Sequence, residues 1–215
     1  MKITRIIIYQ LDMPLNEPYY LSGGRLKFES LDSTFVEIHT DDGLVGWGEG
    51  CPWGHTYLPA HGAGIRAGME ILAPVLIGQD PRSLDHINRL MDVALPGHPY
   101  VKSALDMACW DITGQASNMP LWQMMGGECA TPVAVNSSIS TGTPDEMIAL
   151  IRRASQKGYR THSAKIGGSD PATDWQGLHE VEESIVVLNP KSGWIQNCNS
   201  TPFTSAGPYS PKKED

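Results

Sequence analysis

The 215-residue sequence predicts an α+β domain, followed by the first strand-helix-strand unit of a parallel sheet and then by an irregular tail. Three observations predict this fold class. Residues 3–49 contain three strand-like segments, and Asp41-Asp42-Gly43 between the last two is typical of a hairpin turn. Residues 60–127 repeat apolar side chains at helical spacing. A helix-start signal at Thr143 separates two further strand-like segments, a pattern that builds right-handed βαβ units.

The first part of the chain is expected to be a three-stranded antiparallel meander. Its strands are predicted at residues 3–11, 33–39 and 44–49, where β-branched and alternating apolar residues concentrate. Residues 15–26 and 51–57 are too irregular for an element and are predicted to be loops. Both loops carry aromatic and polar groups, so they are candidates for ligand contacts, with two ordinary surface loops as the alternative.

A helical bundle is expected to pack on this meander. Residues 60–76 and 83–93 are predicted helices, the second with Ser83 as its N-cap. Residues 103–127 form a third, amphipathic helix that ends in a Pro-Leu turn and a double glycine. Its carboxylates, Asp106 and Asp111, are predicted to be structural, because they lie off the apolar stripe. The domain is expected to close at about residue 128.

A strand-helix-strand unit follows the predicted domain. Residues 131–139 read as a buried strand and residues 159–166 as a second strand. Between them, Thr143, Pro144 and Glu146 form a capping box that starts a helix. We expect domains at residues 1–128 and 129–172 and a separate tail at residues 173–215.

Composition excludes several classes of function. The net charge of −8, with both signs interspersed, offers no basic stripe for nucleic acid. No apolar run approaches the 18 residues of a membrane span, and the first residues lead into a strand, so a soluble cytoplasmic protein is expected. The four cysteines lie far apart without a C-x-x-C pair, which favours reduced, mostly buried thiols over a zinc site or disulfides.

Residues 1–170 resemble the mandelate racemase and muconate lactonizing enzyme branch of the enolase superfamily. The resemblance is strongest in A-L-D-M-A-C-W-D-I-T-G-Q-A-S-N-M-P-L-W-Q-M-M-G-G, at residues 104–127, and is supported by D-D-G-L-V-G-W-G-E, at residues 41–49. Within this branch, Y-Y-L-S-G-G-R, C-P-W-G and S-A-K-I-G-G resemble cis-3-hydroxyproline dehydratases and related proline-derivative epimerases.

The resemblance implies a capping domain over a modified (β/α) barrel, with two capping loops that close the substrate site. The implied substrate-binding residues are Tyr20, Ser22, Trp53 and Tyr57. It also implies Mg²⁺, held by three carboxylates on successive barrel strands. The metal would stabilise the enolate that forms when a base removes the proton α to a carboxylate. The implied partner is therefore a small carboxylic acid.

The resemblance further implies that Lys165 is the catalytic base. Family members carry K-x-K on the second barrel strand, and Ser163-Ala164-Lys165 stands there in this sequence. Strand alternation puts Ser163 and Lys165 on one face, whereas His162 points away with Ala164 and is structural. Ser163 cannot supply the positive charge by which the family's first lysine lowers the pKa of the base. A lysine that only snorkels from a strand end is the alternative.

The sequence departs from the family after Lys165. A complete barrel takes about 250 residues, whereas 85 follow residue 130. No later Asp or Glu matches the metal ligands, since Glu180, Glu182 and Glu183 cluster locally, as on a solvated surface. We therefore expect a truncated barrel, no metal ligands and little activity of this chain alone. The exposed strand edges would need covering, by oligomerisation or by the tail.

From about residue 174 the sequence resembles a segment of the penicillin acylase family, through N-P-K-S-G-W-I-Q-N-C-N at residues 189–199. An asparagine of this run helps to form that family's oxyanion hole, so the resemblance implies Asn197 or Asn199 as the matching position. The family's nucleophile, a serine freed at a chain terminus, has no counterpart. The change of resemblance indicates a fusion of unrelated segments between residues 168 and 174, with a divergent natural C-terminus as the alternative.

Three functions follow as hypotheses. The first is an enolase-superfamily racemase, epimerase or dehydratase of a small acid such as hydroxyproline. The second is a fragment of an N-terminal-nucleophile amidohydrolase, and the third is a non-catalytic capping module that binds small acids or self-associates.

Overall fold

The computed structural model describes most of the chain in two compact units. The described residues are 1–21, 26–56, 58–128, 132–140, 142–166, 179 and 193–198, with backbone alone at residues 21, 165, 166 and 193–198. The first unit comprises Met1–Glu17 and Phe28–Pro132, and the second comprises Pro18–Lys27 and Val133–Asp215. Within the described residues, no helix is long and apolar enough to cross a membrane.

The sheet of the first unit is the predicted antiparallel meander. Its strands β1 (Ile3–Leu21), β2 (Leu26–Thr40) and β3 (Val45–Gly50) lie in the order β1-β2-β3, and Glu37 of β2 is opposite Trp47 of β3. The prediction of an irregular loop over residues 15–26 is wrong for residues 15–21 and Leu26, which are strand. Pairing with β2 keeps this polar segment extended without an apolar alternation. Because β1 is an edge strand, it also tolerates Pro14 and Pro18.

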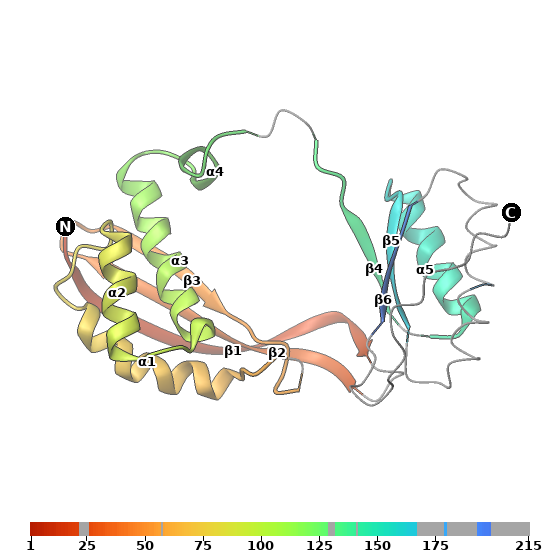
Figure 1. The fold of residues 1–215 in the computed structure, drawn as a ribbon, viewed down its shortest axis with the longest axis horizontal. Coiled ribbons are helices and arrows are strands. Elements are labelled where there is room, and N and C mark those ends of the chain that lie inside the picture. The colour runs from red at the N-terminus through yellow and green to blue at the C-terminus, as the bar shows by residue number, and fades with distance from the viewer. Residues whose placement is uncertain are drawn as a thin grey trace, which may run out of the picture. The chain divides into compact units, whose positions relative to one another are not determined.

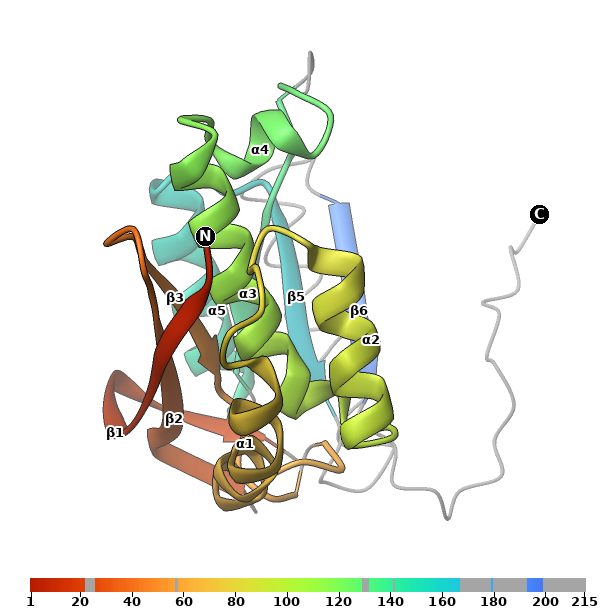
Figure 2. The same cartoon turned by 90° about the vertical axis from the view of Figure 1, so that its left-hand side faces the viewer.

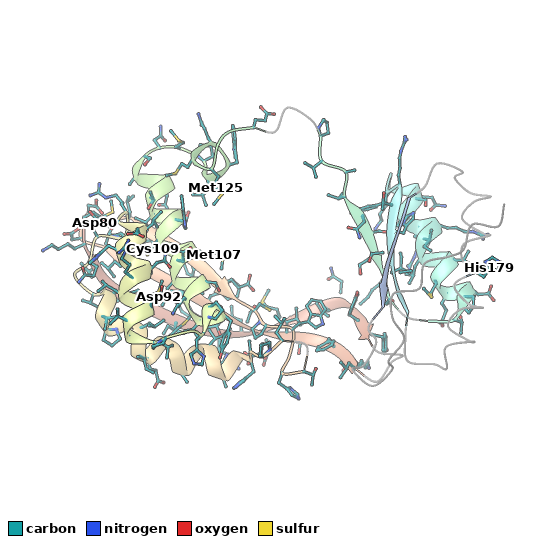
Figure 3. All side chains as sticks on the ribbon, viewed as in Figure 1. Asp80, Asp92, Met107, Cys109, Met125 and His179 are labelled. Carbon is teal, nitrogen blue, oxygen red and sulfur yellow. The ribbon has the colours of Figure 1, made fainter. Side chains whose placement is uncertain are left out.

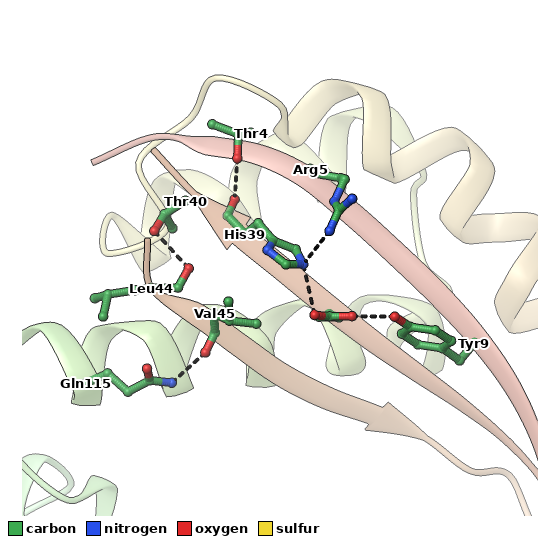
Figure 4. A network of polar contacts seen from close by, with 9 residues as sticks. Thr4, Arg5, Tyr9, His39, Thr40, Leu44, Val45 and Gln115 are labelled. Atoms are coloured by element: carbon green, nitrogen blue, oxygen red, sulfur yellow. Dashed lines mark hydrogen bonds and ion pairs between the residues drawn. The ribbon is translucent and has the colours of Figure 1, made fainter. Parts of the chain in front are cut away.

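A network of polar side chains joins the edge strand β1 to β2 (Figure 4). Tyr9 donates a hydrogen bond of 2.5 Å to Glu37, whose other carboxylate oxygen lies 2.9 Å from Nε2 of His39. That nitrogen is also 3.2 Å from the guanidinium of Arg5. The Tyr9 ring stacks on Trp47, with ring centroids 6.0 Å apart. The hydrogen bond to Glu37 raises the pKa of the Tyr9 hydroxyl. These side-chain contacts connect β1 with β2 and β3 and are therefore structural.

Three helices cover one face of the β1-β2-β3 sheet (Figures 1 and 2). They are α1 (Gly62–Leu76), α2 (Leu84–Ala94) and α3 (Pro99–Ala116), and a short α4 (Leu121–Met124) follows. The core between sheet and helices contains Val36, Ile38, Ile65, Met69, Leu72, Leu76, Ile87, Met91, Leu105 and Ile112. Ser83 precedes α2, as predicted, but its side chain makes no capping hydrogen bond.

The predicted helix over residues 103–127 is two helices. α3 begins at Pro99 and ends at Ala116, and the chain then turns at Asn118, which has a φ of 48°. A second turn follows α4, where Gly126 and Gly127 have φ values of 121° and 95° that glycine adopts without steric cost. The predicted end of the helical region at the double glycine is therefore confirmed, with an internal break.

The backbones of α3 and β3 approach each other closely at two glycines. A Cβ atom on Gly46 would overlap the carbonyl oxygen of Ala108, and one on Gly48 would overlap that of Ala104. Small residues on both sides of the contact let the helix lie directly on the strand. This approach fixes the position of α3 on the sheet.

Polar side chains of α3 reinforce this contact and show what its carboxylates do. Asp111 accepts a 2.9 Å hydrogen bond from the backbone N–H of Trp47, and Gln115 donates one of 2.7 Å to the carbonyl of Val45 (Figure 4). Asp106 accepts a 2.7 Å hydrogen bond from Asn88 of α2. Asp106 and Asp111 thus make structural hydrogen bonds, as predicted.

The described cysteines differ in their surroundings. Cys109 lies in α3 (Figure 3) and is buried, and this burial raises the pKa of its thiol to about 12. Cys51 is exposed, so the expectation of a buried thiol is wrong for this residue, which follows the end of an edge strand. Neither forms a disulfide.

The second unit contains the predicted strand-helix-strand arrangement. Strand β4 (Asn136–Ile139), helix α5 (Pro144–Gln156) and strand β5 (Thr161–Ile166) follow in order, and β4 and β5 are parallel. The capping box is confirmed, because Thr143 accepts from the Glu146 N–H and Glu146 accepts from the Thr143 N–H. The prediction of a buried strand from residue 131 is wrong for residues 132–135, which are exposed and outside β4. The ladder with β5 begins only at Asn136, opposite Thr161.

A segment of the tail supplies a third strand to this sheet. Strand β6 (Gly193–Cys198) pairs in parallel with β5 on the side away from β4. The edge of β5 is therefore covered by the tail, one of the two coverings that the sequence led us to expect. The Trp-Ile pair in this segment is typical of strands, whatever family the surrounding sequence resembles. The rest of the tail lies outside the described residues, apart from His179.

One face of β5 packs against α5. Ile139, Met147, Ile151 and Ala164 form the apolar core here. His162 is only 2% exposed on the same side, with Nδ1 2.7 Å from the Ser137 hydroxyl and Nε2 3.4 Å from that of Ser155. The prediction that His162 is structural is thus confirmed. Its burial disfavours the charged imidazolium and lowers its pKa.

Protonation of His162 is expected to destabilise the second unit. Because its pKa is lower in the folded state, the unfolded chain binds the proton more tightly, so the stabilisation is complete above pH about 6.5 and is lost as the pH falls towards the folded pKa. The carboxyl pKa values of Asp32, Asp42 and Asp80 are also lowered. These groups titrate at a more acidic pH than His162 and therefore do not contribute to this effect.

Hydrogen exchange of α5 and β5 between pH 7 and pH 5 would measure this effect. Protection, corrected for the intrinsic pH dependence, should fall in the wild type, and should fall less in His162→Gln. An equal fall in both proteins would contradict the assignment.

Candidate active site

Strand β5 has two faces, and by alternation the position of the predicted base falls on the face that points away from α5. His162 and Ala164 pack on the α5 side, and Ser163 alternates to the other face, where it is 7% exposed. Lys165 follows two residues later in the same strand, and its backbone pairs with Asn197 of β6. The side chain of Lys165 lies outside the described part of the chain. Its role as a base therefore stays a prediction that rests on strand position.

Two hydroxyl groups join Ser163 on this face. Ser138 of β4 is the cross-strand neighbour of Ser163 in the parallel register. Its Oγ lies 2.8 Å from the hydroxyl of Tyr19, which is in the last part of β1 and belongs to the second unit. Three hydroxyl side chains, from three strands, are thus joined to this face of β4 and β5.

Sequence reasoning missed Tyr19 and Ser138. Ser138 could have been found by aligning the two parallel strands at their carboxyl ends, which pairs it with Ser163. No sequence signal distinguishes Tyr19 from the predicted Tyr20, which is half-buried at the next position. Their alternation along β1 becomes informative only once this segment is known to be a strand.

The other predicted substrate-binding residues are only partly described. Ser22 and Tyr57 lie outside the described residues. Trp53 lies in the first unit, in a segment that is a loop, as predicted for residues 51–56. Its ring centroid is 5.6 Å from that of Phe28. Gly54 turns the chain here with a φ of 66°, and an added Cβ would touch the Phe28 ring at 2.8 Å. Phe28 thus supports this loop from β2.

An ion pair between β2 and α1 is structural. Arg66 of α1 donates two hydrogen bonds, of 2.8 and 3.0 Å, to the carboxylate of Asp32 and one of 3.1 Å to Thr34. The hydrogen bonds from Arg66 hold the pKa of the Asp32 carboxyl below its usual value. Asp32 therefore stays ionised and ties β2 to α1.

The described residues do not fit the magnesium site that the resemblance implies. Across residues 1–166, apart from the short undescribed gaps, and in His179 and β6, no three His, Cys, Asp or Glu side chains gather as metal ligands. β6 itself contains no acidic residue and presents Asn197 opposite Lys165. Glu180, Glu182, Glu183 and Asn199 lie outside the described part.

Two family models match separate parts of the sequence. Residues 3–126 match the N-terminal domain of the mandelate racemase / muconate lactonizing enzyme family. Residues 148–214 match the penicillin amidase family. The second match overlaps α5, β5 and β6 of the second unit.

Individual relatives agree with the first match. The chain is 41% identical over 202 residues to a cis-3-hydroxy-L-proline dehydratase of Roseibium aggregatum, covering 92% of this chain and 55% of the relative. An enolase-superfamily structure from Roseovarius nubinhibens, complexed with magnesium, has a TM-score of 0.79 and 60% identity over 92% of this chain and 52% of that one.

A more distant solved structure, the N-succinyl Arg/Lys racemase of Bacillus cereus, has a TM-score of 0.83 at 29% identity and covers 91% of this chain and 52% of its own. The chain thus spans about half the length of the relatives it matches. The meander, the helices on its one face and the match over residues 3–126 together show that the chain belongs to the mandelate racemase / muconate lactonizing enzyme family of the enolase superfamily.

Proposed function

We propose that this chain carries the capping domain and the base-bearing strand of a racemase, epimerase or dehydratase. Its substrate would be a small carboxylic acid such as a hydroxyproline. The observation that carries the proposal is the division of β5 into two faces. His162 and Ala164 are used in packing on α5, which leaves the face of Ser163, and by alternation the position of Lys165, for chemistry.

The proposed reaction begins with removal of the proton on the carbon α to the substrate carboxylate. The Lys165 amine takes this proton, and the electron pair of the broken C–H bond moves into an enolate. Delivery of a proton from solvent to the opposite face gives the epimer. Departure of a β-hydroxyl group as water, with the proton that the Lys165 ammonium group returns, gives a dehydrated product. Tyr20, Ser22, Trp53 and Tyr57 are the proposed substrate contacts.

The amine must be neutral to act as a base. A free lysine has a pKa of about 10.4, so work near neutral pH needs a decrease of roughly three units. With Ser163 in place of a second lysine, burial has to supply most of this decrease. Ser163 itself is almost fully buried, which supports a poorly solvated environment at this end of the strand.

Magnesium remains the family's cofactor, but we propose no step through it in this chain. Among the described residues, no three His, Cys, Asp or Glu side chains gather as a metal site. Without such an electrophile the enolate is costly, so this 215-residue polypeptide is expected to turn over slowly or not at all.

Proton exchange in D₂O tests the proposal. The purified chain, with MgCl₂ and cis-3-hydroxy-L-proline or L-proline, would be followed by ¹H NMR for loss of the α-proton signal. We expect exchange close to the buffer rate, and we expect Lys165→Ala to remove whatever excess is present. Lys157→Ala, which removes an exposed lysine just after α5, is the matched control and should behave as the wild type.

The outcomes distinguish whether the chain is active from whether Lys165 is the base. Fast exchange that Lys165→Ala abolishes would confirm the base and overturn the expected weak activity. Fast exchange that survives Lys165→Ala would contradict the base assignment. A folded chain without exchange above the buffer rate agrees with the expected weak activity, and it is equally what the non-catalytic capping module would show.

A second candidate function rests on the match of residues 148–214 to penicillin amidases. If the chain acted as an amidase fragment, Asn197 or Asn199 would stabilise the oxyanion that forms during hydrolysis. The pairing of β6 with β5 argues against a separate acylase unit, because residue 197 lies in the parallel sheet that begins with β4.

Hydrolysis of an N-acyl amide such as a phenylacetylated chromogenic amine would decide this alternative. We expect no hydrolysis above the buffer rate, because the chain has no counterpart of the processed N-terminal serine. Turnover that is lost in Asn197→Ala or Asn199→Ala would show that the acylase-like segment is functional.

A further inference from the structure

We propose that Tyr19 is a positioning residue, which holds Ser138 so that the Ser138 hydroxyl contacts the substrate. The inference rests on the proposed function, because that function makes the Ser163 face of β4 and β5 the substrate side. It adds two residues that the family resemblance did not suggest. The observation behind it is the 2.8 Å contact between the two hydroxyl oxygens, across 119 positions of the sequence.

Strand β4, which carries Ser138, is held in place by its packing on the α5 side. Its two α5-facing residues are engaged, since Ile139 is 2% exposed in the apolar core and the Ser137 hydroxyl bonds to His162. Ser138 lies between them and alternates to the other face, where it is exposed. The contacts of Ser137 and Ile139 therefore hold the backbone at Ser138 in place. The Ser138 side chain is exposed on the opposite face of the strand.

Tyr19 limits how the Ser138 hydroxyl can point. A serine hydroxyl has one proton to donate and two lone pairs to accept, and its rotation is otherwise free. If Tyr19 donates its proton to Ser138, the serine proton is left for an oxygen atom of a ligand. A carboxylate or hydroxyl oxygen of a small acid, bound beside Ser163, is the chemical group that matches this donor.

The contact also anchors the last part of β1. Pro18–Lys27 belongs to the second unit, and Tyr19 provides a hydrogen bond from this segment to β4. Tyr20, a proposed substrate contact, is the next residue. Loss of the Tyr19 hydroxyl should therefore loosen this part of β1 and release Ser138 at the same time.

Hydrogen exchange of the full chain tests the positioning role without any substrate. In Tyr19→Phe we expect the amide groups of residues 18–21 and 136–139 to exchange about fivefold faster, the size expected for one lost hydrogen bond. Ser138→Ala should have the same effect, and the double variant no further one. Tyr9→Phe is the matched control, because it removes a tyrosine hydrogen bond from β1 in the first unit. Unchanged exchange in Tyr19→Phe, or additive effects in the double variant, would overturn the proposal.

Titration with cis-3-hydroxy-L-proline, followed by NMR, tests the ligand contact. We expect Tyr19→Phe and Ser138→Ala each to weaken binding about five- to tenfold, and we expect Ser138→Thr, which keeps the hydroxyl, to bind as the wild type does. Tyr9→Phe should leave binding unchanged. Equal affinity of the wild type, Tyr19→Phe and Ser138→Ala would overturn this proposal but not the proposed function. Failure of the wild type to bind would overturn both, even if the exchange results hold.

Discussion

The close approach of β3 and α3 is the constraint on which the first unit depends. Gly46 and Gly48 leave no room for a side chain, because the carbonyl oxygens of Ala108 and Ala104 stand where a Cβ would be. With the two backbones in contact, Asp111 and Gln115 reach the backbone of β3, and the apolar side of α3 covers the sheet. The loop that starts at residue 51 leaves directly from this strand. Its position, and that of Trp53, therefore follows from the same contact.

In the second unit, the alternation of β5 separates the face that packs on α5 from the face that carries Ser163. One face is occupied by the packing of Ala164 and the hydrogen bonds of His162. The other face gathers hydroxyl groups, and the strand reaches the predicted base two residues after Ser163. The neighbouring strand β6 lies in the segment that matches penicillin amidases, and its Asn197 is opposite Lys165.

Local signals were sufficient to predict much of this fold from the sequence. The Asp41-Asp42-Gly43 turn and the capping box at Thr143 each require particular residues at fixed spacing, and both elements are where the sequence predicts them. The division of β5 into two faces also follows from a period of two alone. The assignment of Asp106 and Asp111 as structural needed only their place on the helix surface.

The features that sequence reasoning missed depend on partners distant in the chain. Residues 15–21 have no apolar alternation and become strand through pairing with β2. Residues 132–135 have the composition of a strand, but β5 begins too late to pair with them. β6 lies in a segment that resembles another family, so its place beside β5 could not be inferred from that resemblance. The contact of Tyr19 with Ser138 joins residues 119 positions apart, and no local pattern encodes it.

The stability of Gly48→Ala tests most directly whether the family's capping fold, built on the contact of α3 with β3, is present in this chain. Urea unfolding should show a loss of about 3 kcal/mol, because the new methyl group meets backbone that cannot move away. Hydrogen exchange of α3 would assign the loss to the first unit. Gly43→Ala is the control, since Gly43 has a φ of 89° but open space around it, and should cost about 1 kcal/mol from backbone strain alone. A smaller loss in Gly48→Ala than in Gly43→Ala would contradict the account.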